Sequence, residues 1–220
     1  MKLKKTSLLI HAVGLATAVL MGSASAATIV ASTVTSPTSI INTTGTGGSL
    51  ISAANFGEVA VTVNGILHGA GSAAGVNLTQ SFVFEGDFRD GGTVHGGVLE
   101  TLFSGIAGAN GITMSISGLT VGREYLYQAY WEGVTGQTLS VTIEGDTLNN
   151  VADAALGVLI SYQFTAGDDT LNIFMDRDDG ITTGDLNNWI SGYSLQTTVP
   201  EPSTALLGGL GLLALLRRRR

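Results

Sequence analysis

Hydrophobic and polar residues alternate with a period of two along much of the chain between residues 59 and 195. A period of two is that of a strand whose one side-chain phase is buried while the other phase meets solvent. The apolar phases are Val59, Val61 and Val63; Phe82 and Phe84; Ile112, Met114 and Ile116; Tyr125, Tyr127, Ala129 and Trp131; Leu139, Val141 and Ile143; Leu171, Ile173 and Met175; and Ile190, Tyr193 and Leu195. Clean alternation is typical of antiparallel sheets with one solvated face.

Turn-forming dipeptides such as Asn64-Gly65 and Gly145-Asp146 separate these runs. Residues 98–106 carry apolar side chains at helical spacing, which predicts one short helix. Residues 35–49 are polar and glycine-rich, which predicts a loop or a loose strand. Roughly eight or nine strands without repeated helices predict an all-β fold, an antiparallel β-sandwich of the jelly-roll kind in preference to a closed barrel.

One turn carries a more specific pattern, Gly118-Leu119-x-x-Gly122-x-x-Tyr125. It resembles the turn before a tyrosine corner in fibronectin type III domains and similar sandwiches, where a tyrosine hydroxyl hydrogen-bonds nearby backbone. The strand-like runs that follow Tyr125 continue for longer than in fibronectin type III. This continuation, with its closing segment Trp189–Leu195, resembles the galactose-binding-type jelly rolls of exported bacterial proteins.

The first 26 residues have the features of a secretory signal peptide. Three lysines precede an apolar stretch at residues 8–21, and Ala24-Ser25-Ala26 gives the small-x-small pattern that signal peptidase reads. We therefore expect a signal-peptide helix at residues 1–26 and cleavage between Ala26 and Ala27. An uncleaved membrane anchor is the alternative.

Charge is distributed unevenly along the chain. Residues 27–198 contain three arginines, no lysine and sixteen acidic residues, so their net charge is near −13, whereas the whole chain carries −7. Phosphate backbones and anionic lipid surfaces repel such a domain, so nucleic acid is not an expected partner. The chain has no cysteine. Residues 27–198 are therefore expected to form one domain that depends on its hydrophobic core alone.

The C-terminal end carries the most specific pattern in the chain. The first part comprises Val199, Pro200, Glu201 and Pro202, and the terminal basic cluster comprises Arg217, Arg218, Arg219 and Arg220. Between them lies an apolar stretch at residues 205–216. The prolines hold the first part extended, as a protease requires, and the arginines favour the cytoplasmic side of a membrane.

These features, in this order, resemble the PEP-CTERM sorting signal over residues 199–220. The resemblance implies that an exosortase, an integral-membrane cysteine transpeptidase-like enzyme, recognises Pro200-Glu201-Pro202 and removes the tail. It also implies export through the inner membrane of a Gram-negative-type bacterium that builds an exopolysaccharide or biofilm matrix. The protein would then be displayed at the cell surface or in that matrix.

The apolar stretch of the tail would form a helix about 18 Å long. The hydrocarbon core of a bilayer is about 30 Å thick, so this transmembrane helix is short. Its length favours transient anchorage in the inner membrane before processing over a permanent single-pass anchor, which is the alternative. The signal concerns sorting alone and leaves the activity of residues 27–198 open.

Residues 27–198 offer little of the chemistry that enzymes use. Their only histidines are His68 and His95, cysteine is absent, and no Gly-x-Ser-x-Gly sequence is present. Thiol catalysis and the usual α/β-hydrolase site are therefore excluded. Sixteen carboxylates offer many pairs for glycoside hydrolysis, and spacing alone cannot single one out. We expect a non-catalytic protein, with a secreted glycoside hydrolase or lyase on the same scaffold as the alternative.

An acidic cluster, Asp176-Arg177-Asp178-Asp179-Gly180, lies near the end of the domain. Alternate carboxylates beside a glycine suit calcium, although the EF-hand pattern fails because its third ligand position falls on Gly180. We expect no cofactor. The alternative to an ordinary acidic turn is a structural calcium site made of Asp176, Asp178, Asp179 and Asp185.

Exposed aromatic rings are another route to a sugar ligand, because they stack on the apolar faces of sugars. Tyr130 and Trp131 point to opposite faces of a regular strand, so we expect one of those two faces to be exposed, and Trp189 lies near a loop. Core packing is the alternative for all three rings. Three hypotheses remain: a surface protein that binds polysaccharide, a purely structural domain, and a carbohydrate-active enzyme.

Overall fold

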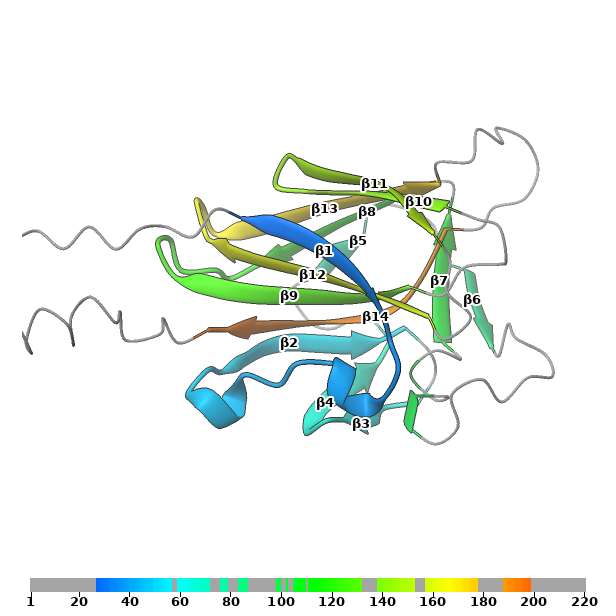
Figure 1. Ribbon diagram of the computed structural model, residues 1–220, viewed down its shortest axis with the longest axis horizontal. Helices are drawn as coiled ribbons and strands as arrows, with labels where there is room; N and C mark the ends of the chain where they lie inside the picture. The colour runs from blue at the N-terminus through cyan, green and yellow to red at the C-terminus, as the bar shows by residue number, and fades with distance from the viewer. Residues whose placement is uncertain are drawn as a thin grey trace, which may run out of the picture.

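The computed structural model describes residues 27–56, 59–71, 76–78, 83–86, 98–99, 102, 105–109, 111–131, 138–152, 157–177 and 188–198. Within these ranges the chain forms fourteen strands that assemble into two sheets, packed face to face as a sandwich (Figure 1). The predicted all-β sandwich of the jelly-roll kind is therefore confirmed.

The larger sheet has the strand order β1-β12-β9-β14-β2-β4-β3, and the pair β6–β7 joins it through β14. Its strands are β1 (Thr28–Thr33), β12 (Val158–Thr165), β9 (Glu124–Trp131), β14 (Asn188–Thr197), β2 (Leu50–Asn55), β4 (Ile66–Ala70), β3 (Val61–Val63), β6 (Val83–Gly86) and β7 (Gly105–Ala109). The pairs are antiparallel except β2–β4, which is parallel, so the expectation of purely antiparallel sheets is wrong at this one pair.

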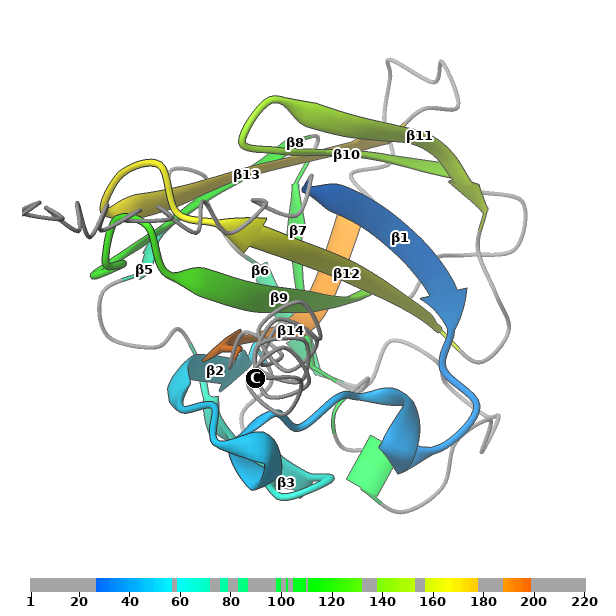
Figure 2. The ribbon, with the colours of Figure 1, turned by 60° about the vertical axis from the view of Figure 1, so that its left-hand side comes forward.

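The smaller sheet has the order β11-β10-β13-β8-β5, and it forms the upper layer in Figures 1 and 2. Its strands are β11 (Asp146–Ala152), β10 (Thr138–Ile143), β13 (Thr170–Arg177), β8 (Gly111–Ser117) and β5 (Val76–Leu78). The predicted alternation appears directly in β10, whose burial switches residue by residue between half-buried and buried.

The main core lies between the two sheets. The smaller sheet contributes the predicted apolar phases of β8, β10 and β13, and the larger sheet contributes those of β9 and β14, all with side chains that are nearly or fully buried. This match between sequence phase and burial is what a period of two predicts for a half-buried strand.

A second apolar cluster covers the opposite face of the larger sheet, a layer that the alternation did not predict. It contains Val34, Ile40, Val61, Val63, Ile66, Leu99, Leu102, Tyr130 and Leu159. The β3–β4 hairpin and the segment before β2 fold under the sheet to build it (Figure 2). The central strand β9 is consequently buried on both of its faces.

The segment at residues 35–49 is a loop, as predicted, and contains two single-turn 3-10 helices, η1 (Pro37–Ser39) and η2 (Thr44–Thr46). Buried amides of the sheet hold it in place. The Gln196 side chain accepts from the Thr43 N–H at 2.9 Å and donates to the Ile41 carbonyl at 2.8 Å. Gln128 Oε1 accepts from the Ile41 N–H at 3.0 Å. The buried amides of Gln128 and Gln196 are therefore paired, and the loop closes the second core layer.

The predicted helix at residues 98–106 is right only in its first part. Val98, Leu99 and Leu102 are helical, and the two leucines are buried. Ile106 instead lies in β7, which pairs with β14 and β6. Short apolar runs fit a helix or a strand equally well, so spacing alone did not separate Ile106 from the leucines before it.

The tyrosine corner is present. The Tyr125 hydroxyl accepts a hydrogen bond from the Thr120 backbone N–H at 2.8 Å, and the Tyr125 side chain is buried. Gly118 and Gly122 take positive φ angles of 95° and 79°, which explains why glycine stands at both positions of the pattern. The turn thereby fixes how the chain crosses from β8 to β9.

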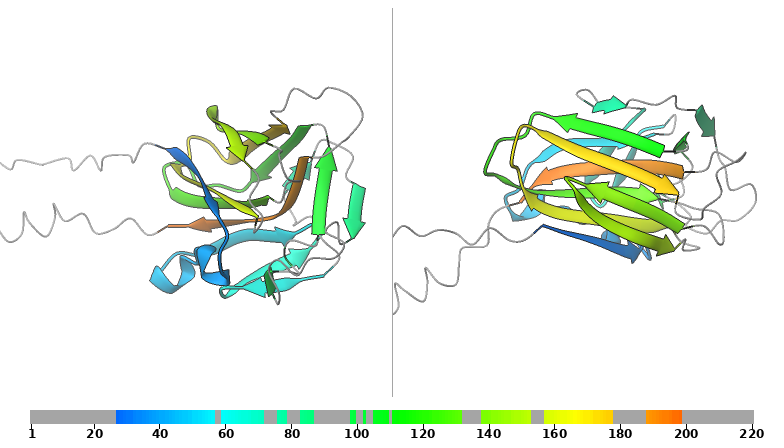
Figure 3. Two further views of the ribbon diagram at one scale, coloured as in Figure 1. Left: turned by 45° about the vertical axis from the view of Figure 1, so that its right-hand side comes forward. Right: turned by 90° about the horizontal axis from the view of Figure 1, so that it is seen from above.

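Both ends of the described domain emerge at the same end of the sandwich, where β1 begins and β14 finishes (Figures 1 and 3). In the described ranges no helix is long and apolar enough to cross a bilayer. The expected helices at residues 1–26 and 205–216 lie outside those ranges. The domain limits at Ala27 and Thr198 thus stay predictions.

Candidate functional site

Tyr130 and Trp131 are both buried, with exposures of 0 % and 1 %. The prediction that one of these two faces is exposed is therefore wrong. Trp131 packs into the core between the sheets, whereas Tyr130 belongs to the second apolar cluster on the opposite face. Neither ring is available to stack on a sugar, because both faces of β9 are covered.

A buried polar contact explains how Tyr130 fits into an apolar layer. Its hydroxyl donates to Ser194 Oγ at 3.0 Å and lies 2.9 Å from Nε2 of His68, while Nδ1 of His68 lies 3.2 Å from the Ile66 carbonyl oxygen. Burial lowers the pKa of His68 to about 4 and raises the pKa of Tyr130. Both groups are neutral near pH 7 and out of reach of a ligand, so the cluster is structural.

Trp189 lies in β14, where it pairs with Gly108 of β7, and its side chain is outside the described part of the structure. The acidic cluster is mostly outside it too: Asp176 is the last of its carboxylates that the structure describes, and Asp178, Asp179 and Asp185 lie beyond. Among the described residues no three acidic or histidine side chains gather as metal ligands would. The calcium site therefore stays a prediction.

The outward face of the smaller sheet is the best candidate for a ligand-binding surface, and we call it the outer face. Four neighbouring strands, β11, β10, β13 and β8, build it (Figure 3, right). Their solvent-facing side-chain phase is mostly polar. Its described side chains include Thr113, Ser115, Ser140, Thr142, Thr147, Asn149, Asn172, Phe174 and Asp176. Apart from Phe174 they all carry hydroxyl, amide or carboxylate groups.

Phe174 stands in the middle of the outer face with 43 % of its surface exposed. Its cross-strand neighbours are Thr142 on β10 and Thr113 on β8. The next row along the strands pairs Asp176 with Ser140. The ring is thus an exposed apolar platform surrounded by groups that hydrogen-bond.

Several groups of the outer face are held in place by one another. Ser115 Oγ donates to Asn172 Oδ1 at 3.0 Å, and the hydroxyls of Thr142 and Thr147 lie 2.9 Å apart. Ser140 donates to Asn149 across the hairpin. Because these side chains are already oriented, a ligand that binds them loses less side-chain entropy.

Sequence reasoning missed Phe174, although the signal was present. In the run from Leu171 to Met175 the apolar phase is odd-numbered, and Phe174 falls on the even phase between Asn172 and Asp176. A large aromatic residue in the polar phase of a strand with one wet face is an exposed ring. The same logic failed at Tyr130 because β9 has no wet face.

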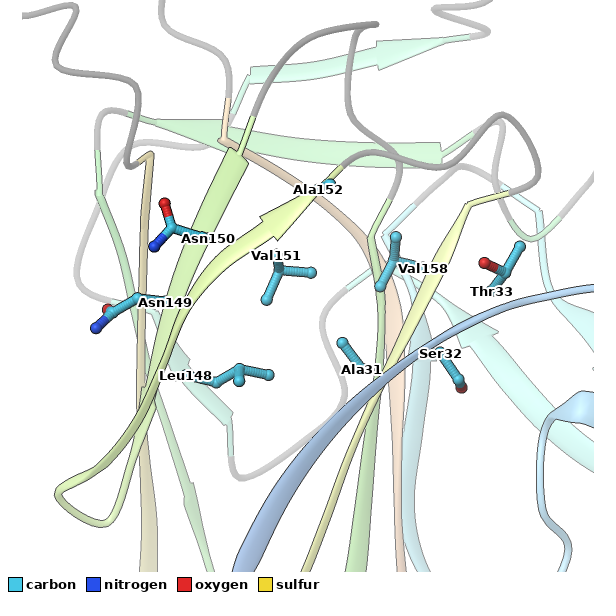
Figure 4. Close-up of a pocket in the computed structure, with 9 residues that line it drawn as sticks. All are labelled: Ala31, Ser32, Thr33, Leu148, Asn149, Asn150, Val151, Ala152 and Val158. Carbon is cyan, nitrogen blue, oxygen red and sulfur yellow. The ribbon is translucent and has the colours of Figure 1, made fainter.

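A pocket of about 340 Å³ lies between the edge strands β1 and β11 (Figure 4), and Phe174 is not among its lining residues. Its described lining residues are Ala31, Ser32, Thr33, Leu148, Asn149, Asn150, Val151, Ala152 and Val158. None of them is charged. The pocket is therefore a second place where the molecule could hold a small neutral group.

Comparison with known families identifies one segment of the chain. Residues 198–220 match the PEP-CTERM protein-sorting motif. The motif implies processing by an exosortase, with export and transient membrane anchoring before display at the cell surface or outside the cell. The predicted sorting signal is confirmed. The PEP-CTERM match covers the tail only and assigns no activity to the domain.

No curated protein matches the sequence. Among solved structures, the ANX2 ectodomain from Arabidopsis thaliana is similar with 8 % identity and a TM-score of 0.51, covering 70 % of this chain and 51 % of that one. The CBM22-1 xylan-binding domain of Paenibacillus barcinonensis Xyn10C has 13 % identity and a TM-score of 0.39, covering 70 % and 97 %. The chain spans about half the length of the ANX2 ectodomain, and at 8 % identity this likeness shows the fold alone.

Proposed function

We propose that this exosortase-sorted extracellular protein is a non-catalytic polysaccharide-binding protein, and that its outer face is the binding surface. We further propose that it serves in the exopolysaccharide or biofilm matrix of a Gram-negative-type bacterium. The observation that carries the binding proposal is the exposed ring of Phe174 within ordered rows of hydroxyl and amide side chains.

The chemistry of this surface suits a sugar chain. An aromatic ring packs on the C–H face of a sugar ring, and flanking hydroxyl, amide and carboxylate groups bond the sugar hydroxyls. The cross-strand spacing of about 5 Å places these groups in regular rows on either side of Phe174. A flat, open face of this kind accommodates the middle of a long chain.

Charge favours a neutral polysaccharide over an anionic one. The described residues of the outer face include Asp176 and no lysine or arginine. Residues 27–198 carry a net charge near −13, so a polyanion would be repelled at low ionic strength. The carboxylate of Asp176 instead offers an acceptor to sugar hydroxyls.

A non-catalytic role agrees with the surroundings of the titratable groups. His68, one of the domain's two histidines, has no surface exposure and lies in the second apolar cluster's layer. The outer face presents Asp176 on a flat surface, whereas glycoside hydrolysis needs two carboxylates that flank a bond. His95 lies outside the described residues.

The proposal is tested with Phe174→Ala in the full-length protein. Affinity electrophoresis through gels that contain a neutral β-glucan or a neutral galactomannan measures retardation, and alginate serves as the anionic comparison. Loss of the ring should weaken binding to the neutral polymer at least about tenfold. Thermal stability should change little, because the ring lies on the surface with 43 % of its area exposed.

Leu67→Ala is the matched control, since Leu67 is a 58 % exposed apolar residue on β4 of the other sheet. It should bind as the unaltered protein does. Unchanged retardation of Phe174→Ala would remove the outer face as the binding surface. Release of reducing sugars from either polymer by the unaltered protein would overturn the non-catalytic role.

A further inference from the structure

The pocket between β1 and β11 exists because the two sheets separate along this edge of the sandwich. At one end they are tied together: the Tyr162 hydroxyl on β12 donates to Asp146 Oδ2 at the start of β11, at 2.9 Å. Ile29 of β1 pairs with Tyr162 at the same end. The pocket lies towards the other ends of the two strands, where residues 31–33 of β1 and 148–152 of β11 line it (Figure 4).

The walls of this pocket are aliphatic. Leu148 and Val151 of β11 point into it, and Ala31 of β1 and Val158 of β12 face them across the gap (Figure 4). Val151 and Val158 are 6 % and 3 % exposed, so the floor is continuous with the main core. No aromatic side chain is among the described lining residues.

A β-bulge turns the polar residues of β11 away from the pocket. Asn149 and Asn150 separate Leu148 from Val151 and point to the other side of the strand (Figure 4). The register with β10 shifts at this place, and Asn150 has a φ of 56°, which asparagine tolerates better than most residues. In a regular strand, residues three positions apart such as Leu148 and Val151 would lie on opposite faces, so the bulge is what places both on the pocket side.

The size and chemistry of the pocket select a small neutral group. A volume of about 340 Å³ is at the lower end of small-molecule sites. A charged group would lose hydration in this pocket, and no charged side chain of opposite sign is among the described lining residues. Ser32 and Thr33 add hydroxyls on the β1 side. Aliphatic walls beside hydroxyls suit a methyl group carried on a polar molecule.

We propose that this pocket binds the methyl group of an uncharged sugar residue, either the acetyl methyl of an N-acetylated sugar or the C6 methyl of a 6-deoxyhexose. That a sugar carries this methyl group rests on the proposed function. The affinity of the pocket for a methyl group does not depend on it. The site is separate from Phe174, so each site is tested by variants of its own.

Saturation-transfer difference NMR on the full-length protein tests this inference with three free sugars: N-acetylglucosamine, L-fucose and glucose. Saturation transfer should be strongest at the acetyl methyl of N-acetylglucosamine or at the C6 methyl of L-fucose. Comparing these two sugars shows which kind of methyl group the pocket binds. Burial of one methyl group should favour the methyl-bearing sugar over glucose about fourfold in affinity.

Two variants fill the pocket from opposite walls, Ala31→Phe on β1 and Val151→Phe on β11. Each should abolish methyl transfer. Val30→Phe is the matched control, because Val30 is adjacent on the same strand, 52 % exposed and not part of the lining. Thermal unfolding identifies any variant that fails to fold. If one pocket variant fails, the other one tests whether a filled pocket abolishes methyl transfer.

The outcomes separate the two proposals. Methyl transfer that survives in Phe174→Ala and disappears in the filled variants supports the pocket even if the outer face binds nothing. Absence of methyl transfer from both sugars overturns the inference, and so does equal affinity for glucose. Undiminished transfer in both filled variants overturns it as well, and none of these three results affects binding at Phe174.

Discussion

Two neighbouring tyrosines of β9 show how differently one hydroxyl group can act inside this core. The Tyr125 hydroxyl accepts from the Thr120 N–H, whereas the buried Tyr127 hydroxyl has no hydrogen-bond partner among the described residues. Burial raises the pKa of Tyr127 well above its usual value, so this hydroxyl stays neutral. A buried hydroxyl without a partner costs free energy, while a paired one stabilises its partner.

Removing the two hydroxyls should therefore have opposite effects. Tyr125→Phe leaves the Thr120 N–H without its acceptor and should lower the free energy of unfolding by about 1–2 kcal/mol. Tyr127→Phe removes an unpaired polar atom and should leave stability unchanged or raise it by up to about 1 kcal/mol. Urea unfolding of both variants checks this, each serving as the other's control. An equal loss of unfolding free energy in both variants would show that the hydrogen bond between Tyr125 and Thr120 does not stabilise the fold.

At the scale of whole strands, the sequence pattern correctly predicts the buried residues of strands with one solvent-exposed face. It fails for strands that are covered on both faces. The alternation of Ile112, Met114 and Ile116 leads directly to β8. In β9 the second phase carries the large apolar residues Leu126 and Tyr130 beside Gln128, and apolar residues on both phases are typical of a strand covered on both sides.

The second core layer could not be predicted because its contacts join segments far apart in the chain. Leu99 and Leu102 meet Val61, Val63 and Ile66 under the larger sheet, and no local pattern specifies that meeting. The outer face could have been predicted from the position of Phe174 in the polar phase of its strand. The pocket depends on the β-bulge in β11, and a bulge produces no periodic pattern in the sequence.

A second β-bulge shapes β14, the strand that joins β9 and β2 in the larger sheet. The register with β9 shifts between Ile190 and Gly192, which explains why the buried residues Ile190 and Tyr193 are three positions apart instead of two. Gly192 lies close to the neighbouring strand, and a Cβ atom there would overlap the carbonyl oxygen of Ala54. Only glycine permits this approach.

Gly192→Ala should therefore separate β14 from β2 and destabilise the fold by about 2 kcal/mol or more. Gly69→Ala on β4 is the matched control, because its added Cβ would lie 3.9 Å from the nearest atom, the Ala53 carbonyl oxygen. The control should change stability by less than about 1 kcal/mol. Thermal and urea unfolding measure both. A Gly192→Ala protein as stable as the control would contradict the close packing of this bulge.

At the scale of the whole molecule, the sorting motif follows the folded domain without a spacer. β14 ends at Thr197, the Thr198 N–H still donates to the Glu124 carbonyl at 3.1 Å, and the matched motif begins at residue 198. β14 pairs with β9, β2 and β7, so its residues are indispensable to the larger sheet. Fold and sorting signal therefore meet within one or two residues.

This junction predicts opposite fates for two shortened chains expressed in the native host. A chain that stops after Thr198 keeps all of β14, so it should be exported, fold with unchanged thermal stability and no longer be retained by the membrane. A chain that stops after Gly192 loses half of a central strand and the Gln196 contacts to the loop at residues 41–43, so it should be degraded. Fractionation, immunoblotting and thermal unfolding distinguish the two. If the chain ending at Thr198 remained in the membrane fraction as the full-length precursor does, the tail would not be the element that anchors the protein.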